Sequence, residues 1–370
     1  MKTAMMTAAL IAGASGLANG QTVTELRSDN GSIARDINDA GVIVGEQLLA
    51  DGTTLRATMW SGAAGAANDI GVAFGAESST AYAINASGQV VGYSEFGDGL
   101  RTATLWNGAR GTDASILNLG AAMGSTGSSV AWDINDHGVV VGQAPLSPGF
   151  SKGFVWDGTN GGQTAGAPSF YMGSANRGIN NSGSIVGSAF FFGDPDDAYL
   201  AIPDGRGGYS HGDIAPPGYN LSIATDIADN GTIVGFTSFG LDDSWQAAKF
   251  LGRGEIELLG TLDGLENSEA NAVNESGLVV GRAWDNDFME DNAAVAWLDG
   301  VVYDLNDFRG ISGFERLYEA TGVNNNGDIV GFGRMTDGTL SGFVITGFVP
   351  APGAVGVLAM GLGLVSRRRR

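Results

Sequence analysis

The stretch INDAGVIVG, from Ile37 to Gly45, sets the organisation of this chain because it recurs six more times. The other copies are INASGQVVG from Ile84, INDHGVVVG from Ile134, INNSGSIVG from Ile179, IADNGTIVG from Ile227, VNESGLVVG from Val273 and VNNNGDIVG from Val323. Their starts lie 47, 50, 45, 48, 46 and 50 residues apart. A period of this length is typical of repeat architectures, so the sequence predicts one large repeat-built domain.

Each copy is interpreted as a β-hairpin. Asn opens a tight turn, and the glycine three positions later takes the positive φ that other residues avoid. These repeat-turn glycines are Gly41, Gly88, Gly138, Gly183, Gly231, Gly277 and Gly327. In the fifth copy Ala228 replaces the Asn, and Asp229 and Asn230 supply the turn chemistry instead. The second strand ends at another glycine in every copy, as at Gly45.

Two further strands are expected in each repeat. The third follows 19 to 21 residues after the motif start, and in four copies it ends in a tryptophan: Trp60, Trp106, Trp156 and Trp297. We expect these rings to fill the space between repeats rather than to stack on a ligand. A fourth segment, such as Asp69-Ile70-Gly71, is missing from the last repeat, and Val23–Leu26 has the same character.

Four strands per repeat predict an all-β fold, a seven-bladed β-propeller whose ring is closed by the N-terminal strand. The alternative is a β-solenoid. An open solenoid would have no need to place one quarter of its last repeat at the front of the chain.

The two ends of the chain carry address signals. Lys2, the apolar residues 4–17 and Ala18-Asn19-Gly20 predict a signal peptide over 1–20, followed by the repeat domain over 21–347. The tail, 348–370, combines Val349, Pro350 and Pro352 with the apolar run 353–365 and Arg367, Arg368, Arg369 and Arg370. The run is short for a full membrane span, and the arginines hold its end on the cytoplasmic side. A plain anchor helix is the other interpretation.

This tail resembles the PEP-CTERM sorting signal, although Ala351 stands between the prolines where that signal usually has Glu. The resemblance implies a processing partner of exosortase type and delivery to the cell surface, with membrane attachment before processing. The repeats over 21–347 resemble the HAF family of bacterial extracellular repeats, but Arg56, Thr102 and Lys152 occupy the place of its histidine. That family implies an extracellular location and no particular catalytic activity.

Composition excludes several classes of function. The chain has no cysteine, so it has neither disulfides nor thiol chemistry. Without Lys2 and the four terminal arginines it has 14 basic and 40 acidic residues, a net charge of about −26, which argues against a nucleic-acid partner. Its two histidines, His137 and His211, fall at unrelated points of the repeat, and His137 is expected to be a turn residue.

Acidic residues gather between the second and third strands of some repeats. Those that could bind calcium are Asp194, Asp196, Asp197, Asp285 and Asp287. Clustered carboxylates suit Ca²⁺, although their spacing matches no complete calcium loop and a solvated acidic rim explains them as well. A carboxylate pair could instead serve a glycosidase.

The sequence thus predicts an exported, surface-anchored, non-enzymatic module that binds or scaffolds extracellular matrix components, either polysaccharide or surface protein. No catalytic residue and no cofactor other than possible Ca²⁺ is assigned. The alternative is a carbohydrate-active hydrolase or lyase on the same scaffold, with the fourth and sixth repeats as the candidates for its site.

Overall fold

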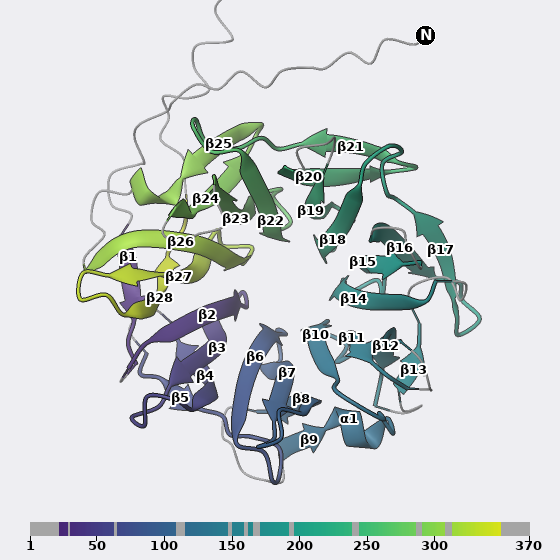
Figure 1. Ribbon diagram of the computed structural model, residues 1–370, viewed down its shortest axis with the longest axis horizontal. Coiled ribbons are helices and arrows are strands. Elements are labelled where there is room, and N and C mark those ends of the chain that lie inside the picture. The colour runs from purple at the N-terminus through teal and green to yellow at the C-terminus, as the bar shows by residue number, and fades with distance from the viewer. Residues whose placement is uncertain are drawn as a thin grey trace, which may run out of the picture.

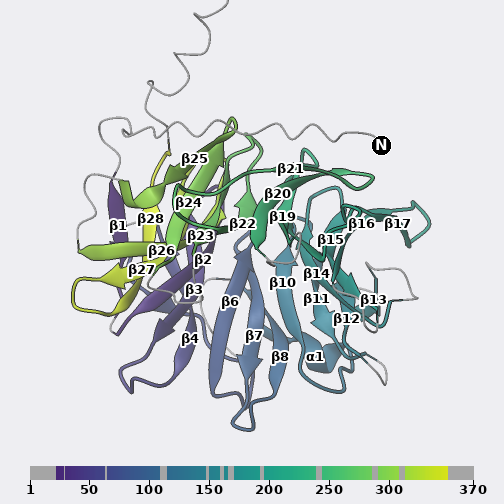
Figure 2. The same ribbon diagram turned by 45° about the horizontal axis from the view of Figure 1, so that its top comes forward.

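The seven repeats form seven four-stranded antiparallel sheets, the blades, arranged in a ring around one axis (Figure 1; tilted view in Figure 2). This computed structural model describes residues 22–28, 30–62, 65–108, 115–146, 150–158, 162–165, 171–191, 196–238, 244–285, 291–307 and 313–348. The fold is therefore the predicted seven-bladed β-propeller. Within each blade the first strand of the repeat lies nearest the axis, and successive strands lie further out.

The strands of blades 1 to 3 run as follows. Blade 1 contains β2 (Ser32–Ile37), β3 (Val42–Leu48), β4 (Leu55–Ser61) and β5 (Asn68–Asp69). Blade 2 contains β6 (Ser78–Ile84), β7 (Gln89–Glu95), β8 (Arg101–Asn107) and β9 (Ile116–Asn118), followed by the short helix α1 (Leu119–Ala122). Blade 3 contains β10 (Val130–Ile134), β11 (Val140–Ala144), β12 (Lys152–Trp156) and β13 (Gly162–Thr164).

Blades 4 to 6 repeat the pattern. Blade 4 contains β14 (Gly173–Ile179), β15 (Ile185–Phe190), β16 (Asp197–Pro203) and β17 (Tyr209–Asp213). Blade 5 contains β18 (Leu221–Ile227), β19 (Ile233–Ser238), β20 (Trp245–Gly252) and β21 (Glu255–Leu258). Blade 6 contains β22 (Asn267–Val273), β23 (Val279–Trp284), β24 (Ala293–Leu298) and β25 (Val301–Asp304), followed by the 3₁₀ helix η3 (Leu305–Asp307).

Blade 7 closes the ring with a strand from the other end of the chain. It contains β26 (Phe314–Val323), β27 (Ile329–Met335) and β28 (Leu340–Ile345), and its fourth strand is β1 (Val23–Leu26). β1 pairs antiparallel with β28, from Val23 opposite Ile345 to Leu26 opposite Gly342. This closure was predicted from the missing fourth segment of the last repeat, and it leaves no unpaired edge between first and last blades.

A bulge interrupts the first hairpin of every blade at the same place. In blade 1 the register shifts between Ala34 and Asp36, so Arg35 has no partner on β3. The shift brings the first strand close to the glycine that ends the motif: a Cβ on Gly45 would lie 2.0 Å from the carbonyl oxygen of Ile33. The corresponding distance lies between 1.9 and 2.1 Å in all seven blades, which explains why this glycine recurs without exception.

The motif turns lie together on one face of the ring, the turn face, and bond to one another. Each repeat-turn glycine has a positive φ, between 76° and 86°, as the turn requires. The side chain of Asn38 caps its own turn by accepting from the amides of Ala40 and Val42, and its Nδ2 donates to the carbonyl of Asn85 in the next blade. Equivalent donations link every blade to the next except at Ala228, where Asn230 donates to Glu275 instead.

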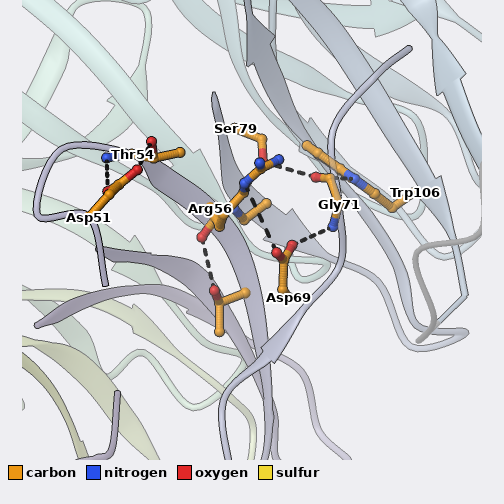
Figure 3. Close-up of polar contacts among 9 residues, drawn as sticks. Asp51, Thr54, Arg56, Asp69, Gly71, Ser79 and Trp106 are labelled. Atoms are coloured by element: carbon orange, nitrogen blue, oxygen red, sulfur yellow. Dashed lines mark hydrogen bonds and ion pairs between the residues drawn. The ribbon is translucent and has the colours of Figure 1, made fainter. Parts of the chain in front are cut away.

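The outer parts of neighbouring blades are joined by a buried tryptophan and a serine (Figure 3). Trp106 of blade 2 is buried among Val44, Met59 and Ile70 of blade 1, and its Nε1 donates to the carbonyl of Gly71 at 3.2 Å. Ser79 donates to the same carbonyl and accepts from the amide of Ala57. Trp60 and Trp297 are buried in equivalent positions, which confirms the predicted role of these rings between blades for three of the four tryptophans, whereas Trp156 is only half-buried.

Candidate functional site

Seven side chains, one from each blade, occupy the bulge position of the innermost strand. They are Arg35, Tyr82, Trp132, Arg177, Thr225, Asn271 and Thr321. All seven are half-buried, whereas the residue before each of them is fully buried between blades. The bulge therefore turns one side chain per blade towards the axis, where the strands converge (Figure 1).

In blades 5 to 7 the bulge side chains are short and bonded to the neighbouring blade. Thr225 donates to the carbonyl of Ala270 at 2.7 Å, and Thr321 donates to that of Ala34 at 2.9 Å. Asn271 donates to the carbonyl of Ala320 and to Oε1 of Glu319, both at 2.9 Å. These contacts hold the inner strands together, and in these three blades the bulge position itself carries only a short side chain.

In blades 1 to 4 the bulge side chains are large and touch one another, forming what we call the axial ladder. The guanidinium of Arg35 lies 5.6 Å from the ring centre of Tyr82, and the rings of Tyr82 and Trp132 are 4.7 Å apart. Between blades 3 and 4, the guanidinium of Arg177 lies 5.6 Å from the ring centre of Trp132. Two cations thus flank two aromatic rings across four consecutive blades.

Two of the arginines near the axis are neutralised by carboxylates. Arg35 makes two hydrogen bonds to the buried Glu46, at 2.6 and 3.2 Å. Burial disfavours its charge, but the attraction of Glu46 outweighs this and raises the pKa of Arg35. Arg282, on β23, bonds to Glu269 at 2.8 Å and lies 3.7 Å from Glu319. Both arginines are therefore held in structural ion pairs.

Arg177 differs from them. Among the described residues its guanidinium has no hydrogen bond and no ion pair, and its Nε is buried without a partner. Burial lowers the pKa of Arg177, with Glu269 and Asp196 opposing the shift from a distance. The ring of Trp132 has its centre 5.6 Å from this guanidinium, and its indole Nε1 is also buried without a partner. Two adjacent donors thus remain unsatisfied at one place on the axis.

Three carboxylates lie one residue further along the innermost strands, towards the turn face. Asp36, Asp133 and Asp226 each accept from the amide of the following residue and from an amide of the next blade. Burial, reinforced by Asp226 and Asp36, raises the pKa of Asp133 to about 8. Burial also raises the pKa of Asp226 to about 6. Because these carboxylates bridge blades through backbone amides, we assign them a structural role.

The two faces of the ring differ in their surface. The face opposite the turns, the loop face, carries the connections between second and third strands and between blades. The large apolar side chains exposed there are Leu55, Phe74, Leu100, Phe150 and Phe191. Phe74 is the extreme, with 94% of its surface exposed. On the turn face, by contrast, most turn amides are occupied by bonds between blades.

Both ends of the described chain lie on the turn face. Val23 pairs with Ile345, and Phe348 donates its amide to the carbonyl of Gly327 in the seventh turn at 2.7 Å. Phe348 also packs against Tyr303, with ring centres 5.7 Å apart. The sorting residues Val349, Pro350, Pro352 and Arg367 to Arg370, like residues 1–20, lie outside the described part of the chain. Within that part no helix is long and apolar enough to cross a membrane.

The acidic residues proposed for calcium are only partly described. Asp194 and Asp287 lie outside the described residues. Asp196 and Asp197 begin the third strand of blade 4, where Asp196 accepts from Ser188 and Asp197 from Tyr171, whereas Asp285 lies in blade 6. The described residues hold no group of three or more potential metal ligands. A calcium site in these loops therefore stays a prediction.

Sequence reasoning did not single out the axial ladder. The signal that could have found it is the position after the recurrent small residue, Ala34 in the first repeat and its equivalents. That position holds Arg, Tyr, Trp, Arg, Thr, Asn and Thr in turn, while the residues around it recur. Variation at one fixed place in a repeat marks a position that the fold leaves free.

Comparisons with known proteins agree on the fold and go no further. No protein-family model and no curated protein sequence matches the chain. Among solved structures, TolB from Acinetobacter baumannii is similar at 13% identity and a TM-score of 0.47, over 84% of this chain and 65% of TolB. The propeller domain of the Trilobed protease from Pyrococcus furiosus is similar at 10% identity and a TM-score of 0.47, over 85% of this chain and 95% of that domain. YCF48 bound to D1 peptide has 11% identity and a TM-score of 0.46, over 90% of this chain and 98% of that one.

Proposed function

We propose that this protein is an exported, surface-anchored propeller that binds an extracellular polysaccharide or protein without transforming it. Its loop face is the binding surface, and the tail over 348–370, processed by an enzyme of exosortase type, is its route to the surface. The observation that carries the proposal is the opposition of the two faces: the chain ends leave from one, and five of the eight exposed large apolar side chains among the described residues lie on the other.

This opposition has a simple physical consequence. A tether attached beyond Phe348 places the turn face towards the membrane and the loop face towards the surroundings. Exposed aromatic side chains at a rim supply the contact area that protein and carbohydrate ligands bind. Three buried carboxylates whose pKa values are raised by burial, Asp36, Asp133 and Asp226, bond to backbone amides, which favours a binding module over a hydrolase.

A binding and turnover screen tests the proposal. The propeller is applied to an array of extracellular polysaccharides and matrix proteins, and retention and released reducing ends are read together. We expect retention without release. The double variant Phe74→Ser/Phe150→Ser should weaken it at least tenfold, since apolar contacts of this kind act as binding hot spots.

The matched control is Ile202→Ser/Leu251→Ser, which alters two exposed apolar residues in hairpins of the turn-face side. It should bind like the unaltered protein. Release of sugar would show a hydrolase or lyase instead, and equal loss in both double variants would show that the loop face is not the binding surface.

A further inference from the structure

We propose that Arg177 and the Trp132 ring form a subsite for a carboxylate-bearing sugar, a uronate residue of an acidic polysaccharide. The inference rests on the proposed function and names the chemistry of its ligand. It follows from Arg177, an axial cation that has no counter-charge within ion-pair distance among the described residues.

The first step concerns charge. Arg35 and Arg282 each have buried or half-buried glutamates within ion-pair distance, whereas Arg177 has none among the described residues. Placing an unpaired cation in a partly buried position is costly, and a partner that arrives with the ligand removes that cost. The fold itself does not require arginine there, because blades 5 and 7 carry threonine at the same position.

The second step concerns geometry. A guanidinium presents its donors in a planar fork that matches the two oxygens of a carboxylate, which ammonium groups do not. Here the guanidinium lies over the ring of Trp132, 5.6 Å from its centre, and the ring of Tyr82 lies 4.7 Å from the same ring. Aromatic rings next to a carboxylate receptor provide an apolar surface for the ring carbons of a pyranose. A carboxylate-binding group and an aromatic surface thus lie next to each other.

The third step concerns access. The Arg177 side chain is half-buried, so part of it reaches solvent near the axis. A second series of contacts connects the ladder to the loop face: Tyr82 lies 5.8 Å from Tyr93, whose ring is 4.6 Å from the exposed guanidinium of Arg101. Arg101 is itself bonded to Glu95, so it does not compete with Arg177 for an anion.

The overall charge of the protein sharpens the inference. A net charge of −21 repels anions from the surface as a whole, so an acidic polymer is not held by general electrostatic attraction. An anion binds only where a specific receptor outweighs that repulsion. We therefore expect affinity for oligouronates to rise when added salt screens the repulsion, the opposite of binding at a basic patch.

Calorimetric titration with a short oligogalacturonate tests the subsite, with a neutral galactose oligomer, acetate and an acidic peptide as comparators. The unaltered protein should bind the oligouronate, and Arg177→Gln should lower the affinity by roughly tenfold to hundredfold. Arg177→Lys should fall between them, because it keeps the charge and loses the fork. The control Arg206→Gln removes the same charge from an exposed hairpin on the turn-face side and should change nothing.

A spectroscopic readout separates binding from a structural effect. Trp132→Phe identifies the indole N–H resonance of Trp132, and in the unaltered protein that resonance should shift on saturation with oligouronate. Equal oligouronate affinity in Arg177→Gln, or no shift of the indole, overturns the subsite. Binding of neutral oligomers or peptide alone overturns the subsite and leaves the proposed function standing. Binding of no ligand by the unaltered protein overturns the subsite, and the array of polysaccharides and matrix proteins then decides the proposed function.

Discussion

Two positions only a few residues apart on the innermost strands differ in how they vary around the ring. At the turns, almost every blade repeats the same chemistry: an Asn that caps its own turn and bonds to the next blade, and a glycine with positive φ. At the bulge, the seven blades carry five different residue types. At both positions the backbone has the same conformation in every blade. Only at the bulge does it leave the side chain free.

This difference separates what holds the ring together from what gives it an individual site. The repeated turn residues satisfy backbone groups of two blades at once, so replacing one affects a whole junction. The bulge residues of blades 1 to 4 contact mainly each other, so they form a local cluster on a common frame. The residues that hold the ring together and the residues of the proposed subsite thus occupy different positions of the same strand.

The largest expected effect breaks the repeated part of this comparison. In Gly235→Ala the added Cβ would lie 2.0 Å from the carbonyl oxygen of Ile223, inside the first hairpin of blade 5. Backbone atoms on both strands must move, so we expect a loss of more than about 3 kcal/mol in the free energy of unfolding. Urea denaturation followed by circular dichroism measures it.

Gly212→Ala is the matched control, since the nearest atom to its Cβ is 3.8 Å away and its φ is not positive. It should leave the unfolding midpoint almost unchanged. If both variants unfold at the same urea concentration, the close approach of the two strands does not explain the recurring glycine.

The same contrast explains how much the sequence alone could predict. Period, turn glycines, buried tryptophans and the strand borrowed from the N-terminus all depend on residues that recur, or on one element that is missing from the last repeat. The bonds between turns were not predicted, because the Nδ2 of Asn38 finds its acceptor 47 residues further along. The ladder was not predicted because no one residue type recurs at all of its positions and its members come together only when the ring closes.

One irregular repeat shows that neighbouring positions adjust to each other. Asn176 takes the place of the recurrent alanine, and its side chain bonds to the carbonyls of Phe154 and Ala165 in blade 3. A Cβ on Gly153 would lie 2.3 Å from Oδ1 of Asn176, and blades 1 and 2 have Ala57 and Ala103 where blade 3 has this glycine. The two departures from the repeat belong together, which no single repeat reveals.

An effect of intermediate size on stability is expected from Asp133, one of the three carboxylates near the axis. Because the folded state raises the pKa of Asp133 to about 8, it binds a proton that the unfolded chain has already lost above its ordinary pKa near 4. Stability from this group is therefore full below about pH 4 and is lost as the pH rises towards 8. Thermal unfolding at a series of pH values measures the slope.

Asp133→Asn should reduce the loss of unfolding free energy over that pH range by at least about 1 kcal/mol. The amide carries no charge, and its oxygen still accepts a backbone hydrogen bond. The substitution also removes the repulsion from Asp226 and Asp36, the charged groups that act on Asp133. The control Asp98→Asn changes an exposed carboxylate in a turn on the loop face and should keep the original slope. A slope that Asp133→Asn does not change would place the titration elsewhere.

The smallest expected effect completes the repeated part of the comparison. At six of the seven junctions the second turn residue of one blade donates its amide to a side chain of the next turn, as Asn325 does to Asp39. At the seventh junction the corresponding residues are Asp39 and Ala86, and the side chain of Ala86 has no hydrogen-bond acceptor for the amide of Asp39. Ala86→Asn supplies one without adding a charge, so we expect a gain of about 0.5 to 1 kcal/mol. The control Ala86→Leu should give no gain in stability. A gain as large as that of Ala86→Asn would show that buried area, and not a seventh hydrogen bond, stabilises the turns.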